Sequence, residues 1–379
     1  MRTTELRLRL ALSVCLFLTV ALVVPARAAQ VTHVVDLSRT AVTIERAPDG
    51  DRVVVTDPAF IRTTDAGLPD LPYRLVNILL PEGETVAEFV YEASPAVRIA
   101  DGTRVSLVPE ALATDGSRPR IAAAHAWSAG NNAFPAKPAV YLGTGYLHGR
   151  AIASFAVYPI RLVEEGSAVE VTEHATLRIQ TAFDENGATV ARRARMREGF
   201  RDDVARRLSS LVVNPLDADR YAPAEQPVAK PRGGFQPTAA PSLEGSPVDY
   251  VIVTADSLAA SFQVLANWKT AKGVRTVVRT TEWIEANYPH GVDLAETIRT
   301  FVIDAYEQWG ITYLLIGGDA NVIPVRYGAS LFLGARDIPV DMYFGCLDGD
   351  WNADHDEFFG EALDQTDMYQ EVFTGRLPA

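Results

Sequence analysis

An acidic segment near the end of the sequence holds the residues best suited to chemistry. Between Asp341 and Glu371 there are ten Asp or Glu and no Lys or Arg. Within it an oxygen-bearing side chain recurs at every second residue, at Asp348, Asp350, Asn352, Asp354 and Asp356. Oxygen ligands at this spacing can surround one hard cation, and such an all-protein set favours calcium over magnesium. The spacing therefore predicts a calcium site, with a merely solvated acidic turn as the alternative.

The same segment departs from the EF-hand loop at two positions. Ala353 stands where the sharp turn favours Gly, and position twelve is Phe359. The nearest carboxylate beyond that position is Glu361. The calcium prediction thus rests on the alternation of oxygen ligands and not on a complete motif.

Asp319 is a second candidate, because it follows the apolar run Tyr313–Ile316 and two glycines. A carboxylate at the end of a buried strand is costly unless it is paired or bound to a metal. The alternative is an Asp that accepts hydrogen bonds from backbone N–H groups in a turn or helix cap. Gly317-Gly-Asp319 lacks the Gly-Lys-Ser/Thr ending of a phosphate-binding loop, so we expect no nucleotide site here.

Nucleophilic catalysis within the sequence has few candidates. Cys346 is the only cysteine besides Cys15, and it lies in the apolar run Tyr343–Leu347, which predicts a small buried hydrophobe and not a thiolate. His355 is nine residues away in the acidic loop, Asp348–Asp356. His290 precedes Gly291 ahead of a helix, where a loop histidine is expected. No catalytic residue is therefore assigned.

The elements that must position these residues fall into two classes. From Val31 to about Phe183 short apolar or alternating runs, separated by Gly and Pro, predict an all-β domain of the sandwich or barrel type. The clearest of the expected strands are Val53–Val55, Val76–Leu80, Thr85–Glu92, Ala151–Tyr158 and Ala168–Thr181.

Two segments of unusual composition follow. Residues 191–208 include seven Arg, mixed with acidic residues, which predicts either a solvated helix or a linker cleaved after Arg. Residues 214–247 contain seven prolines and are predicted to be a linker.

Beyond the linker the pattern changes to α/β. Continuous apolar runs at Tyr250–Thr254, Val274–Val278 and Tyr313–Ile316 alternate with amphipathic helices predicted over 256–272 and 293–309. This alternation predicts a mainly parallel sheet with its ligand edge at Thr254 and Gly317-Gly-Asp319. The predicted organisation is an N-terminal leader at 1–28 and a β-rich domain at 29–190, followed by the Arg-rich segment and linker at 191–247 and an α/β domain at 248–379.

The N-terminus has the form of a signal peptide. Basic residues precede the apolar stretch Leu10–Val24, and Ala26-Arg-Ala28 favours cleavage after Ala28, with a retained anchor as the alternative. Residues 1–28 carry four Arg and one Glu, so cleavage takes the formal net charge from −13 to −16. We therefore expect a secreted or cell-surface protein that binds neither nucleic acid nor, after cleavage, a membrane.

Six separated motifs in the last third of the chain share one order with a known family. They are Tyr250–Thr254, Leu265–Gly273, Ala305–Gly310, Tyr313–Ala320 with Ile323-Pro324, Asp341–Phe344 and Gly375–Ala379. In this order they resemble the catalytic domain of the gingipains, peptidase family C25, which are secreted cysteine endopeptidases with a caspase-like α/β fold. Leu68–Tyr73 with Leu79–Pro81 is similar, more weakly, to the N-terminal propeptide of that family.

The resemblance implies an exported precursor whose own propeptide assists folding and inhibits the catalytic domain until it is cleaved. Protein or peptide substrates are implied, together with structural calcium. Asp319, Asp341 and the carbonyl of Phe344 match positions of a family calcium site.

The family's catalytic His and nucleophilic Cys lie downstream of the Gly-Arg-Leu-Pro motif, so both are expected beyond Ala379. The residues of the specificity pocket are expected there as well, and substrate preference is not predicted. The alternative hypothesis is a non-catalytic exported calcium-binding scaffold or adhesin module.

Overall fold

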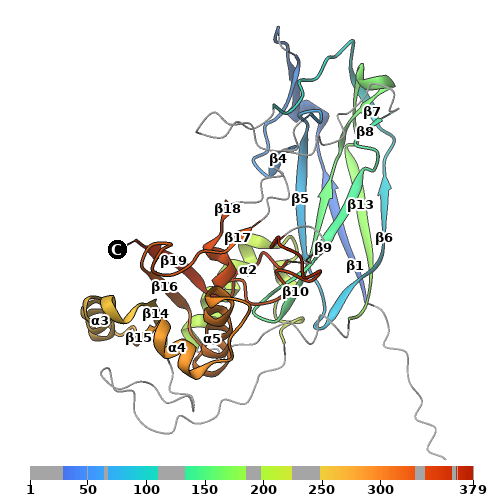
Figure 1. Cartoon of the computed structure of the whole chain (residues 1–379). Coiled ribbons are helices and arrows are strands. Elements are labelled where there is room, and N and C mark those ends of the chain that lie inside the picture. The colour runs from blue at the N-terminus through green and yellow to red at the C-terminus, as the bar shows by residue number, and fades with distance from the viewer. Residues whose placement is uncertain are drawn as a thin grey trace, which may run out of the picture.

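The computed structural model describes residues 29–48, 50–63, 67–109, 133–184, 198–223, 248–328, 338–360, 364 and 366–378. The predicted signal peptide and most of the predicted linker lie outside these residues. An elongated β region and a smaller α/β region lie side by side, with the α/β region against one end of the β region (Figure 1). No helix within the described ranges is long and apolar enough to cross a membrane.

One part of the β region is a pair of packed antiparallel sheets. One sheet has the order β1-β13-β6, with β1 (Gln30–Asp36), β13 (His174–Phe183) and β6 (Glu84–Ala93). The other has the order β4-β5-β10-β9, with β4 (Phe60–Arg62), β5 (Pro72–Leu79), β10 (Arg150–Val157) and β9 (Ala139–Leu147). Alternate residues of both sheets, including Val35, Leu177, Val76 and Phe155, share one buried core, as the period-two pattern predicts.

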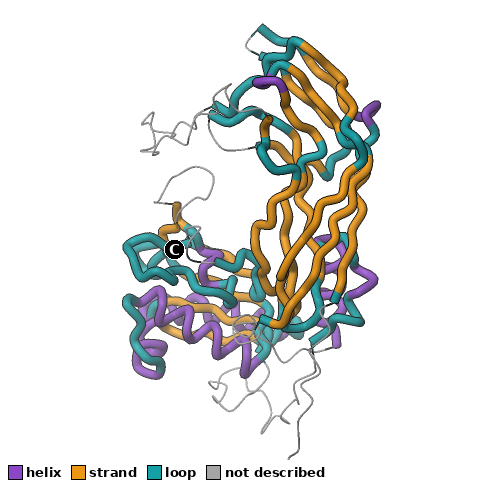
Figure 2. Tube along the Cα trace, turned by 90° about the vertical axis from the view of Figure 1, so that its right-hand side faces the viewer, coloured by secondary structure: helices purple, strands orange, loops and turns teal. Residues whose placement is uncertain are grey.

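The upper half of the β region is built from shorter strands (Figure 2). A four-stranded sheet has the order β7-β12-β11-β8, with β7 (Val97–Asp101), β12 (Ala168–Val171), β11 (Ile160–Val163) and β8 (Ala133–Phe134). A hairpin of β2 (Val42–Glu45) and β3 (Arg52–Val55) packs beside it. The single strand expected over 168–181 was wrong, because the chain passes from one sheet to another at Thr172 and Glu173.

Helix α2 (Glu198–Leu211) lies where the Arg-rich segment was expected to be a solvated helix or a linker. It is a helix, but one side of it is buried. Val204 and Leu208 pack with Leu79 and Ile152 of the β region. The chain after α2, with a short helix at Pro215–Asp217, stays on this surface, where Asn214 bonds the backbone N–H and C=O of Leu79 at 2.8 and 3.0 Å.

The α/β region contains a parallel sheet with the order β15-β14-β16-β19. Its strands are β15 (Thr276–Thr280), β14 (Tyr250–Thr254), β16 (Tyr313–Gly317) and β19 (Phe373–Leu377). Helix α3 (Asp256–Ala271) covers one face through Phe262 and Ala266. Helices α4 (Thr281–Asn287) and α5 (Leu294–Trp309) cover the other face, where the larger core lies.

The predicted helices and their ends agree closely with α3 and α5. Asp293 caps α5 by accepting the N–H of Glu296 at 2.9 Å, and Gly310 ends it with a φ of 68°. Trp268 of α3 is 53% exposed, because Ala266 occupies the inner side of that turn. A short strand pair, β17 (Tyr327–Gly328) and β18 (Ile338–Pro339), and a 3-10 turn at Asp341–Phe344 precede the acidic segment.

Candidate functional site

The carboxyl ends of the parallel strands form the edge at which α/β sheets bind ligands. Thr254 and Gly317 end neighbouring strands there, and the Thr254 hydroxyl donates to the Gly317 carbonyl at 2.6 Å. A Cβ on Gly317 would lie 2.6 Å from the Phe262 ring, and Gly318 has a φ of 146°. Both glycines are therefore required by packing and backbone conformation.

Asp319 lies at this edge but is exposed. Its Oδ1 accepts the N–H of Asn321 at 3.0 Å, and its carbonyl accepts the N–H groups of Val322 and Ile323. This geometry is that of a turn Asp, which was the alternative interpretation.

Asp341 pairs with Arg376 of β19. The Arg376 Nε and Nη2 donate to the two carboxylate oxygens of Asp341, each at 2.7 Å. Nη1 donates to the carbonyls of Gly318 and Ile323 at 3.0 and 2.8 Å. The guanidinium thus occupies a setting of carboxylate and carbonyl oxygens, the ligand types that calcium also prefers.

Two further arginines hold the segment that follows Asp341. Arg299 of α5 donates to the carbonyls of Tyr343, Cys346 and Leu347 at 3.0–3.1 Å. Arg326 makes two bonds to Asp293, at 2.7 and 2.8 Å, and lies over the rings of Tyr343 and Phe359. Phe344, expected to offer a carbonyl to a metal, has its side chain fully buried in the core.

The predicted ligands of the acidic loop are divided by burial. Asp348 is fully buried, whereas Asp350, Asp354 and Asp356 are exposed. Each of these three accepts the backbone N–H two residues ahead, at 2.6–3.3 Å. Among the described residues no group of three or more His, Cys, Asp or Glu is placed to hold one metal ion. The eight predicted ligands are therefore not gathered around one point, and the calcium site stays a prediction.

Buried carboxylates after the acidic loop were missed by the sequence analysis. Burial raises the pKa of Asp367 to about 7, although hydrogen bonds from the backbone N–H groups of Tyr369 and Tyr146 act to lower it. Burial also raises the pKa of Glu371, and the charges of Asp348 and Asp367 raise it further. Glu371 accepts the N–H of Leu347 at 2.9 Å. Sequence pattern gave no signal for this cluster, because the local acidity suggested a solvated turn.

Cys346 is fully buried, as its apolar neighbours predicted. Burial raises the pKa of its thiol, and the charges of Glu371 and Asp367 raise it further. The thiolate, which is the reactive form, is therefore strongly disfavoured.

In a chain that begins at Ala29, Cys346 is the single cysteine. We expect iodoacetamide to leave the folded chain unmodified over an hour at neutral pH and to modify it fully in denaturing guanidinium chloride, because alkylation needs an accessible thiolate. Mass spectrometry gives the extent of reaction. Rapid modification of the folded chain would show that Cys346 is exposed and ionised.

A set of contacts joins the β region to the α/β region. The N–H of Tyr146 donates to Asp367 Oδ2 at 2.5 Å, and the hydroxyls of Ser154 and Tyr369 are 2.9 Å apart. A Cβ added to Gly145 of β9 would lie 2.7 Å from Asp367 Oδ1 and from Tyr369 Cδ2. The facing chains approach so closely that a side chain at Gly145 would overlap the α/β region.

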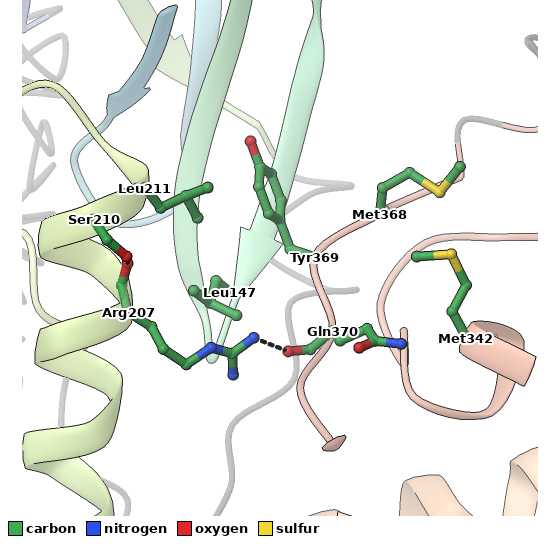
Figure 3. A pocket seen from close by; sticks show the side chains of 8 residues that line it. All are labelled: Leu147, Arg207, Ser210, Leu211, Met342, Met368, Tyr369 and Gln370. Atoms are coloured by element: carbon green, nitrogen blue, oxygen red, sulfur yellow. Dashed lines mark hydrogen bonds between the residues drawn. The ribbon is translucent and has the colours of Figure 1, made fainter. Parts of the chain in front are cut away.

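Arg207 of α2 joins the same contact. Its Nη2 donates to the Gln370 carbonyl at 2.9 Å (Figure 3), and its guanidinium carbon lies 4.5 Å from the centre of the Phe373 ring. Its Nη1 is 3.3 Å from His148 Nε2, and His148 Nδ1 is 2.8 Å from the Tyr306 hydroxyl. We call this set the interface; it comprises Gly145, Tyr146, His148, Ser154 and Arg207 facing Tyr306, Asp367, Tyr369, Gln370 and Phe373.

His148 has a defined role in the interface. Burial lowers the pKa of its ring to about 3, and the charges of Arg207 and Arg150 act in the same direction. The ring is therefore neutral near pH 7, with one donor and one acceptor nitrogen. Because Arg207 can only donate, Nε2 is the acceptor and Nδ1 donates to the Tyr306 hydroxyl.

The interface lies at the amino ends of the parallel strands. Phe373 is the first residue of β19, and Tyr306 lies in the last turn of α5, which leads into β16. Phe373 stacks on Tyr313, whose ring contacts that of Tyr250, at centroid distances of 5.7 and 5.9 Å. The interface contacts are thus at the opposite end of the strands from Thr254 and Gly317.

Asp367 gives the interface a pH dependence. Its pKa is about 7 when buried, against an ordinary value of 3.8, so the folded chain binds this proton more tightly than the unfolded chain. The stabilisation is complete below the ordinary pKa and is lost as the pH rises through about 7. Glu371, whose pKa is also raised, acts in the same sense.

We therefore expect the free energy of unfolding of the wild type, relative to Asp367→Asn, to fall between about pH 5 and about pH 8. Urea titrations at several pH values measure this difference. Asp202→Asn, which alters an exposed carboxylate of α2, is the control. A constant difference between wild type and Asp367→Asn across this range would contradict the assignment.

Residues 244–379 match the model of peptidase family C25. The match covers the whole described α/β region, including Arg376, the residues of the acidic loop and the Asp367–Phe373 side of the interface. The comparison with curated proteins gives no match.

Three solved structures show similarity to this chain. A complex of the pro- and mature domains of RgpB from Porphyromonas gingivalis is 12% identical over 51% of this chain and 95% of that chain, with a TM-score of 0.35. A structure on zymogenic latency of gingipain K from the same organism is 13% identical over 40% and 100%, with a TM-score of 0.28. A third, described as a protease, is 20% identical over 36% and 25%, with a TM-score of 0.25. The similarity of residues 244–379 to peptidase family C25 rests on the sequence match.

Proposed function

We propose that this chain is the N-terminal part of a secreted cysteine endopeptidase precursor of the gingipain type. The observation that carries the proposal is the match of residues 244–379 to peptidase family C25. Residues 248–378 supply the scaffold of a caspase-like catalytic domain, and residues 29–223 supply the propeptide. The catalytic His and Cys follow Ala379 in this proposal.

The direction of β19 supports this division of roles. Because β19 is parallel to β16, its last residue, Leu377, lies beside Gly317 at the carboxyl edge of the sheet. Residues that follow β19 therefore leave the sheet at the edge where α/β folds bind ligands. The described residues organise this edge through Arg376, which donates hydrogen bonds to carbonyls of the Gly318–Pro324 turn. In the complete enzyme a downstream His would take the proton from a downstream Cys, and that Cys would attack the scissile carbonyl.

The interface supports the role of residues 29–223 as a propeptide. It consists of hydrogen bonds, a cation–aromatic contact and close packing at Gly145. These contacts hold the β region and the α/β region together in addition to the linker that connects them. We propose that the β region assists the folding of the α/β region through this surface. Inhibition of the complete enzyme belongs to the same proposal and requires the downstream residues.

The decisive experiment is to sequence the coding region beyond Ala379 and to express the complete reading frame without its signal peptide. We expect a His-Gly and a later Cys, and hydrolysis of casein that a thiol reagent abolishes. Substitution of the downstream Cys should remove the activity, whereas Cys346→Ala should retain it. A stop codon after Ala379, or a complete product without thiol-dependent hydrolysis, would favour the exported calcium-binding scaffold or adhesin.

We also propose that the acidic loop binds structural calcium. The exposed carboxylates of Asp350, Asp354 and Asp356 support this, because each uses one oxygen for a single backbone N–H and retains other lone pairs. The proposal requires these side chains to turn towards one ion, which the described arrangement does not show.

Calcium should raise the melting temperature of the chain by a few degrees, since a ligand at a hundredfold excess over its Kd stabilises by about 2.7 kcal/mol. Differential scanning fluorimetry with calcium, magnesium or a chelator measures the shift. The variant Asp350→Asn/Asp354→Asn should lose it, and Asp202→Asn/Asp203→Asn, on the exposed side of α2, should retain it. Equal melting temperatures with calcium and with chelator would exclude the site.

A further inference from the structure

A cavity of about 440 Å³ lies within the interface. Its lining comes from α2 and β9 on one side and from the chain around Gln370 and Met342 on the other (Figure 3); the residues are Leu147, Arg207, Ser210, Leu211, Met342, Met368, Tyr369 and Gln370. The volume is within the range of small-molecule sites, about 300–1,000 Å³. A molecule bound here would contact both the β region and the α/β region.

Arg207 provides a positive charge at this cavity. Its side chain is half-buried, and no Asp or Glu lies within ion-pair distance of it in the part of the chain that the structure describes. Burial lowers the pKa of its guanidinium, and the more distant charge of Glu371 raises it. Nη1 and Nη2 each make one hydrogen bond, to His148 and Gln370, and a guanidinium has five N–H donors. Donors remain for an anion.

The remaining walls are mainly apolar. Met342 and Met368 lie across the cavity from Arg207 (Figure 3), and Leu147 and Leu211 complete the apolar lining. Thioether side chains adapt to apolar ligands of different shape. A ligand that matches this lining has one anionic group for Arg207 and an apolar chain for the methionines.

We propose that this cavity binds a small carboxylate with an apolar chain, either a free fatty acid or the C-terminal carboxylate of a peptide that ends in an apolar residue. A carboxylate fits the planar guanidinium with charge-assisted hydrogen bonds. Because the ligand contacts both regions, it strengthens their association. The inference does not depend on peptidase activity.

The test uses the chain from Ala29 to Ala379 and isothermal titration calorimetry. The probes are octanoate and the dipeptide acetyl-Ala-Leu with a free C-terminus, and their controls are octanamide and the amidated dipeptide. We expect at least one carboxylate to bind, at least tenfold more tightly than its amide. The two carboxylate probes distinguish a fatty acid from a peptide C-terminus as the source.

Arg207→Met should weaken binding at least tenfold, whereas Arg206→Met, its exposed neighbour on α2, should leave it unchanged. Since Arg207 also supports the interface, Met368→Glu is a second variant. Met368 is 45% exposed and its new charge would repel a carboxylate without removing an interface hydrogen bond. Circular dichroism checks that the variants fold. Absence of carboxylate binding, equal binding of acid and amide, or wild-type affinity in Arg207→Met and Met368→Glu would overturn the proposal.

Discussion

Replacing Arg376 with Met lowers the free energy of unfolding of the α/β region by about 3–5 kcal/mol, the cost of removing one partner from a buried ion pair. The side chain of Arg376 is 13% exposed and that of Asp341 27%. The substitution leaves the Asp341 carboxylate without its two hydrogen bonds and removes donors from the carbonyls of Gly318 and Ile323. Urea unfolding followed by tryptophan fluorescence measures the loss, because four of the five tryptophans lie in residues 248–379.

The matched control is Arg178→Met in the β region. Arg178 pairs with Glu92, and both side chains are about half exposed, at 49% and 52%. We expect a loss below about 1 kcal/mol, since water already solvates such a pair. If Arg376→Met cost no more than Arg178→Met, the guanidinium would not be the group that stabilises this edge.

Replacing Gly145 with Val separates the two regions once the linker is cut. The added Cβ alone would lie 2.7 Å from Asp367 Oδ1 and from Tyr369 Cδ2, and both facing atoms belong to the α/β side of the interface. Overpacking of this kind costs about 1–3 kcal/mol, which corresponds to a roughly five- to 150-fold weaker association. The strand itself tolerates Val, because β-branched residues favour extended backbone.

The measurement uses the chain with a protease site inserted between Pro223 and Val248. After cleavage, size-exclusion chromatography shows whether the two pieces co-elute at decreasing concentration. Leu142→Val, at a 56% exposed position on the same strand, is the control and should leave the association unchanged. Co-elution of the Gly145→Val pieces at the same concentrations as the wild type would mean that the interface does not hold the regions together.

Local sequence patterns predicted the elements well. The apolar runs and caps of the α/β region predicted β14, α3, α5 and β16 within a few residues, because Asp293 and Gly310 act on their own helix ends. The period-two alternation likewise predicted β13. In contrast, β12 and β13 were expected to be one strand, since the alternation does not show that a chain changes sheets.

The position of α2 was not predicted. Its arginines suggested a solvated helix, although Val204 and Leu208 of the helix and Val212 directly after it are buried and recur at intervals of four residues. That spacing was the available signal, and the high charge of the segment concealed it. The partner of this helix, the surface around Leu79 and Ile152, is far away in sequence, so its burial follows from tertiary packing.

The sequence by itself determined the β-then-α/β order, the similarity of residues 244–379 to peptidase family C25 and the burial of Cys346, because each depends on neighbouring residues or on a run of motifs. Only the tertiary structure decided the partners of the charged groups. Asp341 pairs with Arg376, 35 residues later, while its role as a calcium ligand stays a prediction. Arg207 likewise reaches Gln370 across 163 residues. A carboxylate can be satisfied by a metal, a guanidinium or a backbone N–H, and the sequence around it does not show which of these the fold places there.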